Sequence, residues 1–186
     1  MTHTSALYRA QGSSKFMNRT EPSAPSLPLV MPGNVRAGQV ISLVEITGGL
    51  GSKIDAPRLA DELGADIAVL LPILDAAEML GLTRSEKGDI FLTELGLKFQ
   101  KTSKNKVRML KDRLMQIEPF WTALELASRR RSVTTAEVAD SLSQRGVKWH
   151  FTPELNERIV NDLLIHWAIY AGLLSYSGKT GKFQKV

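Results

Sequence analysis

The sequence contains no cysteine, few histidines and no long hydrophobic run. The lack of cysteine excludes disulfides, thiolate metal sites and a cysteine nucleophile, and it fits the reducing cytosol. The longest apolar run, Ile67 to Leu74, is far shorter than the ~20 residues that cross a bilayer. We therefore expect no membrane insertion. The N-terminal region has no unbroken hydrophobic segment with a small-residue cleavage signal, so we expect a cytoplasmic protein rather than an exported one.

The sequence also lacks the residue patterns of a catalytic or metal site. His150 and His166 stand sixteen positions apart, and no carboxylate lies at metal-ligand spacing from either of them. No Ser-His-Asp arrangement is evident, and no pair of carboxylates is marked as an acid and a base. We therefore predict no catalytic residue, no cofactor and no metal, in a protein that is not an enzyme.

Two glycine-rich stretches resemble nucleotide-binding loops in part. Residues 172–180 end in Gly-Lys-Thr like a P-loop, but the first glycine is one position too far away. A P-loop also needs a strand before it and a helix after it, whereas here a helix pattern precedes. Residues 48–53 follow a helix pattern and lack the strand context of a dinucleotide site. We predict a hairpin turn for the first stretch and a connection between helices for the second.

The net charge of +5 is unevenly distributed along the chain. Residues 32–97 carry five basic and ten acidic side chains, whereas residues 98–131 carry ten basic and three acidic ones. Three explanations remain open for the basic stretch. It forms a solvated helix face, it docks on an acidic protein surface of this chain or of a partner, or it binds nucleic acid or anionic lipid.

Proline spacing and apolar periodicity predict the order of the elements. Residues 1–31 predict a disordered tail, because they combine closely spaced prolines with few large apolar residues. Helical periodicity, Asp and Thr caps and glycine stops predict helices at 35–46, 55–64, 66–80, 103–117, 119–130, 134–144 and 153–171. Alternating patterns predict two β-hairpins, formed by 82–84 with 90–92 and by 173–176 with 182–186.

One order of elements occurs twice, which indicates a duplicated module. Helix–turn–helix followed by a β-hairpin is the order of a winged helix. The fold prediction is therefore mainly α with small β-hairpins, arranged as tandem winged-helix modules joined by a helical pair. The expected divisions are a disordered tail (1–31), a first winged-helix module (32–97), basic connecting helices (98–132) and a second winged-helix module (133–186).

The helices at the DNA-reading position of both modules are net acidic. A DNA-reading helix needs Arg, Lys, Asn or Gln for base edges and phosphates. The helix at 66–80 has no lysine or arginine, and the helix at 153–171 has Arg158 alone. Nucleic acid is therefore the disfavoured partner and protein the favoured one. The candidate interaction surface comprises Lys104, Lys106, Arg108, Lys111, Arg129, Arg130, Arg131, Asp66, Asp75 and Glu78.

Several segments resemble the AAA-associated C-terminal domain, over about residues 32–186. They are Gly38–Glu45, Leu59–Leu63, Leu70–Leu82 and Gly88–Gly96, with a weaker match at Trp167–Ala171 and Tyr176. That domain is fused behind the ATP-binding subunit of ABC transporters of the nitrate, sulfonate and taurine type, or stands alone in small prokaryotic proteins. The resemblance implies a regulatory role beside a transport ATPase. It implies no catalytic residue, because the ATP-binding motifs lie in the fused domain.

We therefore predict a non-catalytic regulatory and protein-interaction module. Its expected partner is an ABC-type ATPase subunit or a second copy of this chain. The alternative is a winged-helix DNA-binding transcriptional regulator that uses the second module and the basic middle helices.

Overall fold

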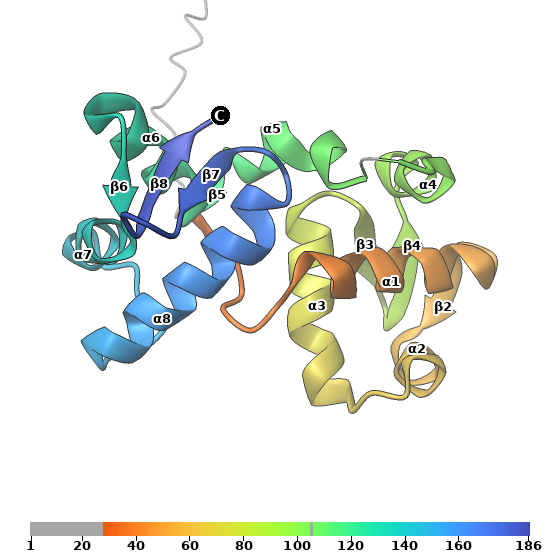
Figure 1. Cartoon of the computed structure of the whole chain (residues 1–186). Helices are drawn as coiled ribbons and strands as arrows, with labels where there is room; N and C mark the ends of the chain where they lie inside the picture. The colour runs from red at the N-terminus through yellow and green to blue at the C-terminus, as the bar shows by residue number, and fades with distance from the viewer. Residues whose placement is uncertain (1–27, 105) are drawn as a thin grey trace, which may run out of the picture.

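The chain forms two units side by side, each with several helices and one small antiparallel sheet (Figure 1). The computed structural model describes residues 28–104 and 106–186. Helices make up most of the regular structure in these residues. The prediction of helices combined with small β-hairpins is therefore confirmed. Residues 1–27 of the expected tail lie outside the described residues.

The first unit is built on a three-stranded sheet of order β2-β4-β3, in which both outer strands pair antiparallel with β4. α1 packs against α2, α3 and α4, and its buried valines and leucine join one hydrophobic core with α3 and the sheet. In chain order the elements are α1 (Ala37–Gly49), β2 (Lys53–Asp55), α2 (Ala56–Leu63), α3 (Ile67–Met79), β3 (Thr83–Glu86), β4 (Asp89–Leu92) and α4 (Glu94–Lys101).

Capping side chains begin α2 and α3 at the residues that the sequence predicts. Asp55 accepts a hydrogen bond from the Arg58 N–H at 3.0 Å, and Asp66 accepts one from the Ala68 N–H at 2.7 Å. These bonds satisfy N–H groups that have no partner inside the helix. Gly64 ends α2 with φ at 59°, a left-handed conformation that costs glycine little. The short connection that results sets the angle between α2 and α3.

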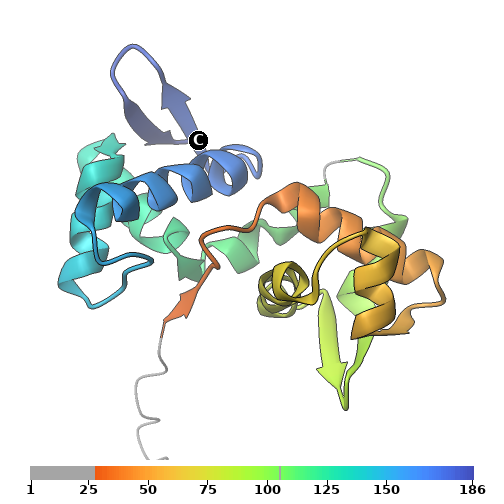
Figure 2. The same cartoon turned by 90° about the horizontal axis from the view of Figure 1, so that it is seen from below.

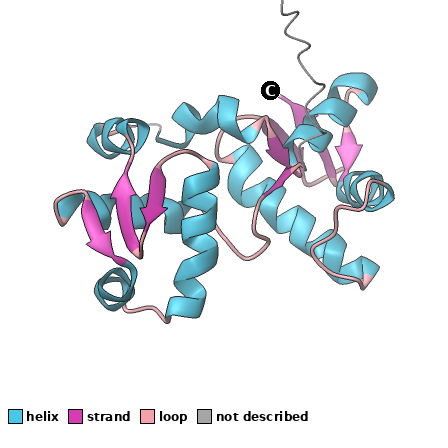
Figure 3. Ribbon diagram, turned by 180° about the vertical axis from the view of Figure 1, so that it is seen from behind, coloured by secondary structure: helices cyan, strands magenta, loops and turns pink. Residues whose placement is uncertain are grey.

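The second unit has a sheet of order β6-β8-β7, again antiparallel (Figure 3). The indole of Trp167 is fully buried beside Phe120, with 6.5 Å between the ring centroids. Thr134 and Glu137 form a reciprocal capping box at the start of α7. The elements are α6 (Phe120–Arg130), β6 (Val133–Thr134), α7 (Thr135–Gln144), α8 (Pro153–Leu163), the π-helix η2 (Leu164–Ile169), β7 (Leu174–Ser177) and β8 (Lys182–Lys185).

The connection between the units differs from the predicted helix at 103–117. It consists of the 3₁₀-helix η1 (Lys106–Leu110), the short α5 (Lys111–Leu114) and the strand β5 (Ile117–Glu118). Strand pairing at Ile117 replaces helix there, so the long helix was wrong in extent. Its apolar positions still point inward, because Val107, Leu110 and Leu114 are buried.

The segment before α1 is bound to the second unit rather than to the first. Strand β1 (Leu29–Val30) pairs in parallel with β5. The indole N–H groups of Trp149 and Trp167 donate to the carbonyls of Met31 and Val35, at 2.6 and 2.9 Å. The predicted tail was therefore too long at its C-terminal end, since this pairing and the burial of Met31 order the chain there. Figure 2 shows this segment passing from the second unit to α1.

A buried carboxylate links β5, α6 and the end of α7. The Glu118 side chain is only 5% exposed, and it accepts hydrogen bonds from the N–H and the hydroxyl of Thr122. The Arg145 guanidinium lies 3.3 Å from Glu118 Oε1, and it also donates to the Thr122 hydroxyl. A buried charge needs this kind of compensation. The cluster therefore fixes α7 against the strand that pairs with β1.

Candidate interaction surfaces

The first two turns of α3 expose large apolar side chains. Ile67, Val69 and Leu71 are 42%, 50% and 51% exposed. The helical periodicity of residues 66–80 predicts that Ile67 and Leu71 face inward together with Leu70 and Leu74, and for Ile67 and Leu71 this is wrong. α3 is apolar nearly all round, so its periodicity does not distinguish the core face, which Leu70 and Leu74 occupy. An exposed apolar cluster of this kind is typical of a protein contact.

The same face of α3 becomes acidic toward its C-terminal end. Asp75 and Glu78 are exposed. Asp75 follows Leu71 by four positions and Glu78 follows Asp75 by three, so both continue the face of Leu71. Asp66 lies at the opposite end, where it caps the helix. The face is therefore apolar in its first half and acidic in its second, and all three predicted acidic residues belong to this helix or its cap.

A shallow groove lies between α3 and α1, on the other side of α3 from Ile67 and Leu71. Its volume is about 260 Å³. Val69 and Ile73 line one wall, and Gly38 and Ser42 of α1 line the other. The groove is therefore separate from the face that carries Ile67 and Leu71. A partner side chain that enters the groove would contact both helices.

The predicted basic residues of the connecting segment have different surroundings. Lys106 is largely covered, and its Nζ lies 2.5 Å from the Glu45 carboxylate of α1. Lys111 donates from Nζ to the carbonyl of Gly172 at 3.3 Å, which joins the connection to the second unit. Lys104 and Arg108 are exposed. Two of these four side chains therefore make contacts within the chain.

The basic residues at the end of α6 form a separate group. Arg129 pairs with Glu125 one turn earlier at 2.7 Å, and Arg130 pairs with Glu137 of α7 at 2.9 Å. Arg131 ends α6 in a left-handed conformation, with φ at 64°. These arginines lie on a different element from the exposed Lys104. The hydrogen bond from the Thr134 N–H, together with the Arg130 guanidinium, holds the pKa of Glu137 below its usual value.

Residues 28–104 and 106–186 hold no group of three metal-ligating side chains. Within the same ranges, every helix falls short of the length or the apolar character that a membrane span requires. His150 stacks on Phe151, with 4.4 Å between the rings, and accepts from the Thr152 N–H. The Gly-Lys-Thr stretch of residues 178–180 lies in the turn between β7 and β8, as predicted.

The model of the C-terminal AAA-associated domain family matches residues 57–177, from α2 to β7. The chain belongs to this family. The matched range includes α3, the connection and most of the second unit of this AAA-associated domain, while α1 and the segment before it precede the range. The resemblance seen in the sequence is therefore confirmed. Neither the comparison with curated proteins nor that with solved structures found a match.

Sequence reasoning missed one set of residues that the fold brings together. Arg36 precedes α1, and His166 and Tyr170 lie at the end of the last long helix, yet all three line one cleft. They are about 130 positions apart in the chain, so no local pattern could have joined them. Only the docking of the segment before α1 on the second unit creates the cleft.

Proposed function

We propose that this chain is a non-catalytic regulatory module that docks on an ABC-type ATP-binding subunit in a prokaryotic cytoplasm. Membership of the AAA-associated family supports association with an ATPase. The exposed face of α3, half apolar and half acidic, is the observation that carries the docking site. The module would act by holding or releasing the ATP-binding subunit, without an ATP site of its own.

We further propose that both units are winged helices in tandem, joined by the connecting segment that the sequence places between them. In each unit a helix, a short strand, two helices and a hairpin follow one another. In each sheet the short strand pairs with the second hairpin strand, which gives the matching orders β2-β4-β3 and β6-β8-β7. In the first unit, α3 then occupies the position that recognises a partner in this class of module.

Chemistry defines the surface that α3 would recognise. Ile67 and Leu71 require an apolar pocket on the partner, since burial of such side chains contributes favourably to binding. Asp75 and Glu78 require lysine or arginine beside that pocket, which sets orientation and rate of association. The exposed Lys104 and Arg108 would form a second, basic part of the surface, for an acidic area of the same subunit.

DNA is the less favoured partner for the same helix. α3 carries no lysine or arginine and exposes carboxylates, which a polyanion repels. The exposed leucine and isoleucine would also lie against phosphates, where they gain nothing. A titration of random duplex DNA followed by fluorescence anisotropy tests this directly. Binding tighter than about 1 µM at ~150 mM salt, with a steep salt slope, would favour the DNA-binding alternative.

Site-specific photo-crosslinking in the source cells tests the docking site. A photoreactive phenylalanine analogue replaces Leu71 of α3 in one strain. In the control strain it replaces Leu155 of α8, which is similarly exposed at 45%. We expect the Leu71 position to crosslink an ABC-type ATP-binding subunit, recognised by its P-loop peptides in mass spectrometry. If this position crosslinks only to a second copy of the chain, the partner of α3 is that second copy and not an ATPase subunit.

Purified proteins then give the affinity. Leu71→Asp should weaken binding to the crosslinked subunit at least tenfold, which corresponds to about 1.4 kcal/mol, because a charge enters an apolar contact. Leu155→Asp should leave the affinity unchanged. The proposed docking on α3 is overturned if the two variants bind with equal affinity, or if the analogue at position 71 crosslinks no ATP-binding subunit. The ATP hydrolysis rate of the subunit, with and without the module, reports the regulatory role.

A further inference from the structure

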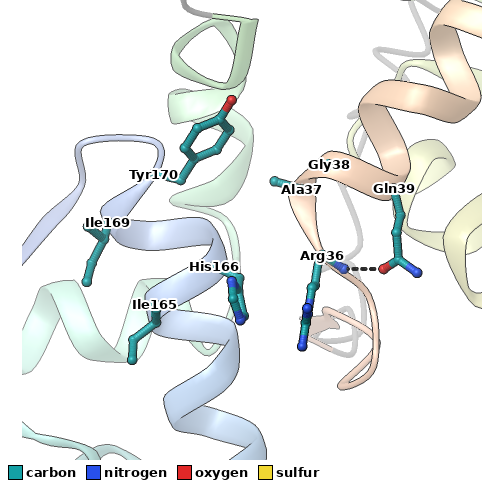
Figure 4. Close-up of a pocket in the computed structure, with 8 residues that line it drawn as sticks. All are labelled: Arg36, Ala37, Gly38, Gln39, Ile165, His166, Ile169 and Tyr170. Carbon is teal, nitrogen blue, oxygen red and sulfur yellow. Dashed lines mark hydrogen bonds between the residues drawn. The ribbon is translucent and has the colours of Figure 1, made fainter.

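A cleft lies at the junction of the two units, between the start of α1 and η2 (Figure 4). Its volume is about 550 Å³, within the usual range of ~300–1,000 Å³ for small-molecule sites. α1 belongs to the first unit and η2 to the second, so an occupant would contact both. The lining residues are Arg36, Ala37, Gly38, Gln39, Ile165, His166, Ile169 and Tyr170.

The lining separates into an apolar wall and a polar edge. Ile165 and Ile169 of η2 are partly buried against the core and still line the cleft. Ala37 of α1 also lines the cleft, whereas Figure 4 shows His166 and Tyr170 as the η2-side residues nearest α1. The π-helical turn that carries them is a local irregularity of the kind found often at functional sites. An apolar ligand body therefore has a wall to rest on.

The polar edge is cationic. Arg36 is exposed, and no carboxylate of the described residues lies within ion-pair distance of its guanidinium. Figure 4 shows the Arg36 and His166 side chains facing one another across the opening. The first turn of α1 contains no acidic residue, so its N–H groups add to the attraction for a negative group.

Other charged groups surround the cleft. Asp162 lines an adjoining cavity of about 230 Å³ together with Arg36 and His166. On the opposite side, Lys106 and Arg108 line a small cavity that Tyr170 closes. The cations Arg36, Lys106 and Arg108 thus lie around the cleft with the carboxylate of Asp162 and that of Glu45, which already pairs with Lys106. The balance favours an anionic ligand group over a cationic one.

We propose that this cleft binds a small organic anion that has an apolar body. The anionic group lies between Arg36 and His166 at the start of α1, and the body rests on Ile165 and Ile169. Such a ligand bridges the two units and holds them in one relative orientation. This site is separate from the docking face of α3, so its test needs no partner protein.

NMR titration of the isolated full chain tests the site with 4-phenylbutyrate as the probe. The neutral 4-phenylbutanamide has the same body and serves as the matched ligand. We expect a dissociation constant on the order of 1 mM for the acid, the usual affinity of so small a ligand. Amide signals of residues 36–39 and 165–170 should shift. The amide ligand should bind about threefold to fivefold more weakly, as expected for one exposed ionic contact.

Matched variants separate the site from general binding. Arg36→Gln should weaken the acid about threefold to fivefold and leave the amide unchanged. Arg158→Gln, which removes an exposed arginine of α8 away from the lining, should change neither. The proposal is overturned if both ligands bind equally, or if Arg36→Gln has no effect on the binding of the acid. It is also overturned if the shifts centre on α3, or if no amide signal shifts at acid concentrations up to about 20 mM.

Discussion

Removal of the Arg145 guanidinium should destabilise the protein, because it leaves the buried Glu118 carboxylate without its cation. Arg145→Met keeps much of the apolar stem and removes the group that lies 3.3 Å from Glu118 Oε1. The N–H and hydroxyl of Thr122 remain as donors to the carboxylate. Water replaces little of the lost interaction, since the Glu118 side chain is only 5% exposed.

The structure also sets the magnitude of this loss. Removing one partner of a fully buried ion pair costs about 3–5 kcal/mol. The Arg145 side chain is 39% exposed, so solvent screens part of the pair and we expect about 2–3 kcal/mol. For a chain of this length, 1 kcal/mol corresponds to about 2–4 °C in Tm. The Tm of Arg145→Met should therefore fall by about 4–12 °C.

Urea unfolding, followed by tryptophan fluorescence and far-UV circular dichroism, measures the effect. Coincident transitions by the two probes would justify a single free energy of unfolding. Glu118→Gln in the Arg145→Met background removes the unpaired charge and should restore at least about 1 kcal/mol. Arg158→Met, at an exposed site of α8, is the control and should stay within ~0.5 kcal/mol. The prediction is refuted if Arg145→Met lowers the free energy of unfolding by less than ~0.5 kcal/mol, or if Glu118→Gln restores none of the lost stability.

Two further predictions concern local contacts. Gly96→Ala should destabilise the protein by more than ~3 kcal/mol in urea unfolding, because the added Cβ would lie 2.1 Å from the Leu82 carbonyl oxygen. Gly49→Ala is the control, because a Cβ there meets open space. Equal destabilisation by the two substitutions would contradict this prediction. Glu137→Gln should lose about 0.5–1 kcal/mol at pH 7. The pKa of Glu137 is lower in the folded protein than the unfolded value of about 4.3. The ionised carboxylate therefore stabilises the fold above that pH, and the stabilisation is lost as the pH falls through the pKa of the folded state. The difference from the wild type should therefore shrink as the pH falls below about 4.3, which urea unfolding at a series of pH values would show; a constant difference would contradict this.

Local signals allowed much of the fold to be predicted. Asp55, Asp66 and Thr134 act as caps, and Gly64 ends α2 in the left-handed conformation. Such signals depend on a few neighbouring residues, so the sequence shows them directly. The strands β2 and β6 were missed because two or three residues are too few for an alternating pattern. They exist because the hairpin beside them offers a free edge.

Contacts between distant segments could not be predicted in this way. The Trp149 indole donates to Met31 across 118 positions of sequence, and no periodicity encodes that approach. The exposure of Ile67 and Leu71 is a similar case, because an apolar helix reveals its buried face only when its neighbours are placed. The cleft at Arg36 depends on the same long-range docking. The acidic half of α3, in contrast, was visible in the charge count.

The attachment of β1 to β5 has a mechanical consequence. Residues 29–35 are held by β5 and by the indoles of Trp149 and Trp167, although α1 itself belongs to the first unit. Tension applied to the chain ahead of Leu29 would act first on the β1–β5 pair and on the indole hydrogen bonds at Met31 and Val35. The first unit would feel that tension only after these bonds break. Whatever moves the N-terminal chain therefore acts on the second unit first.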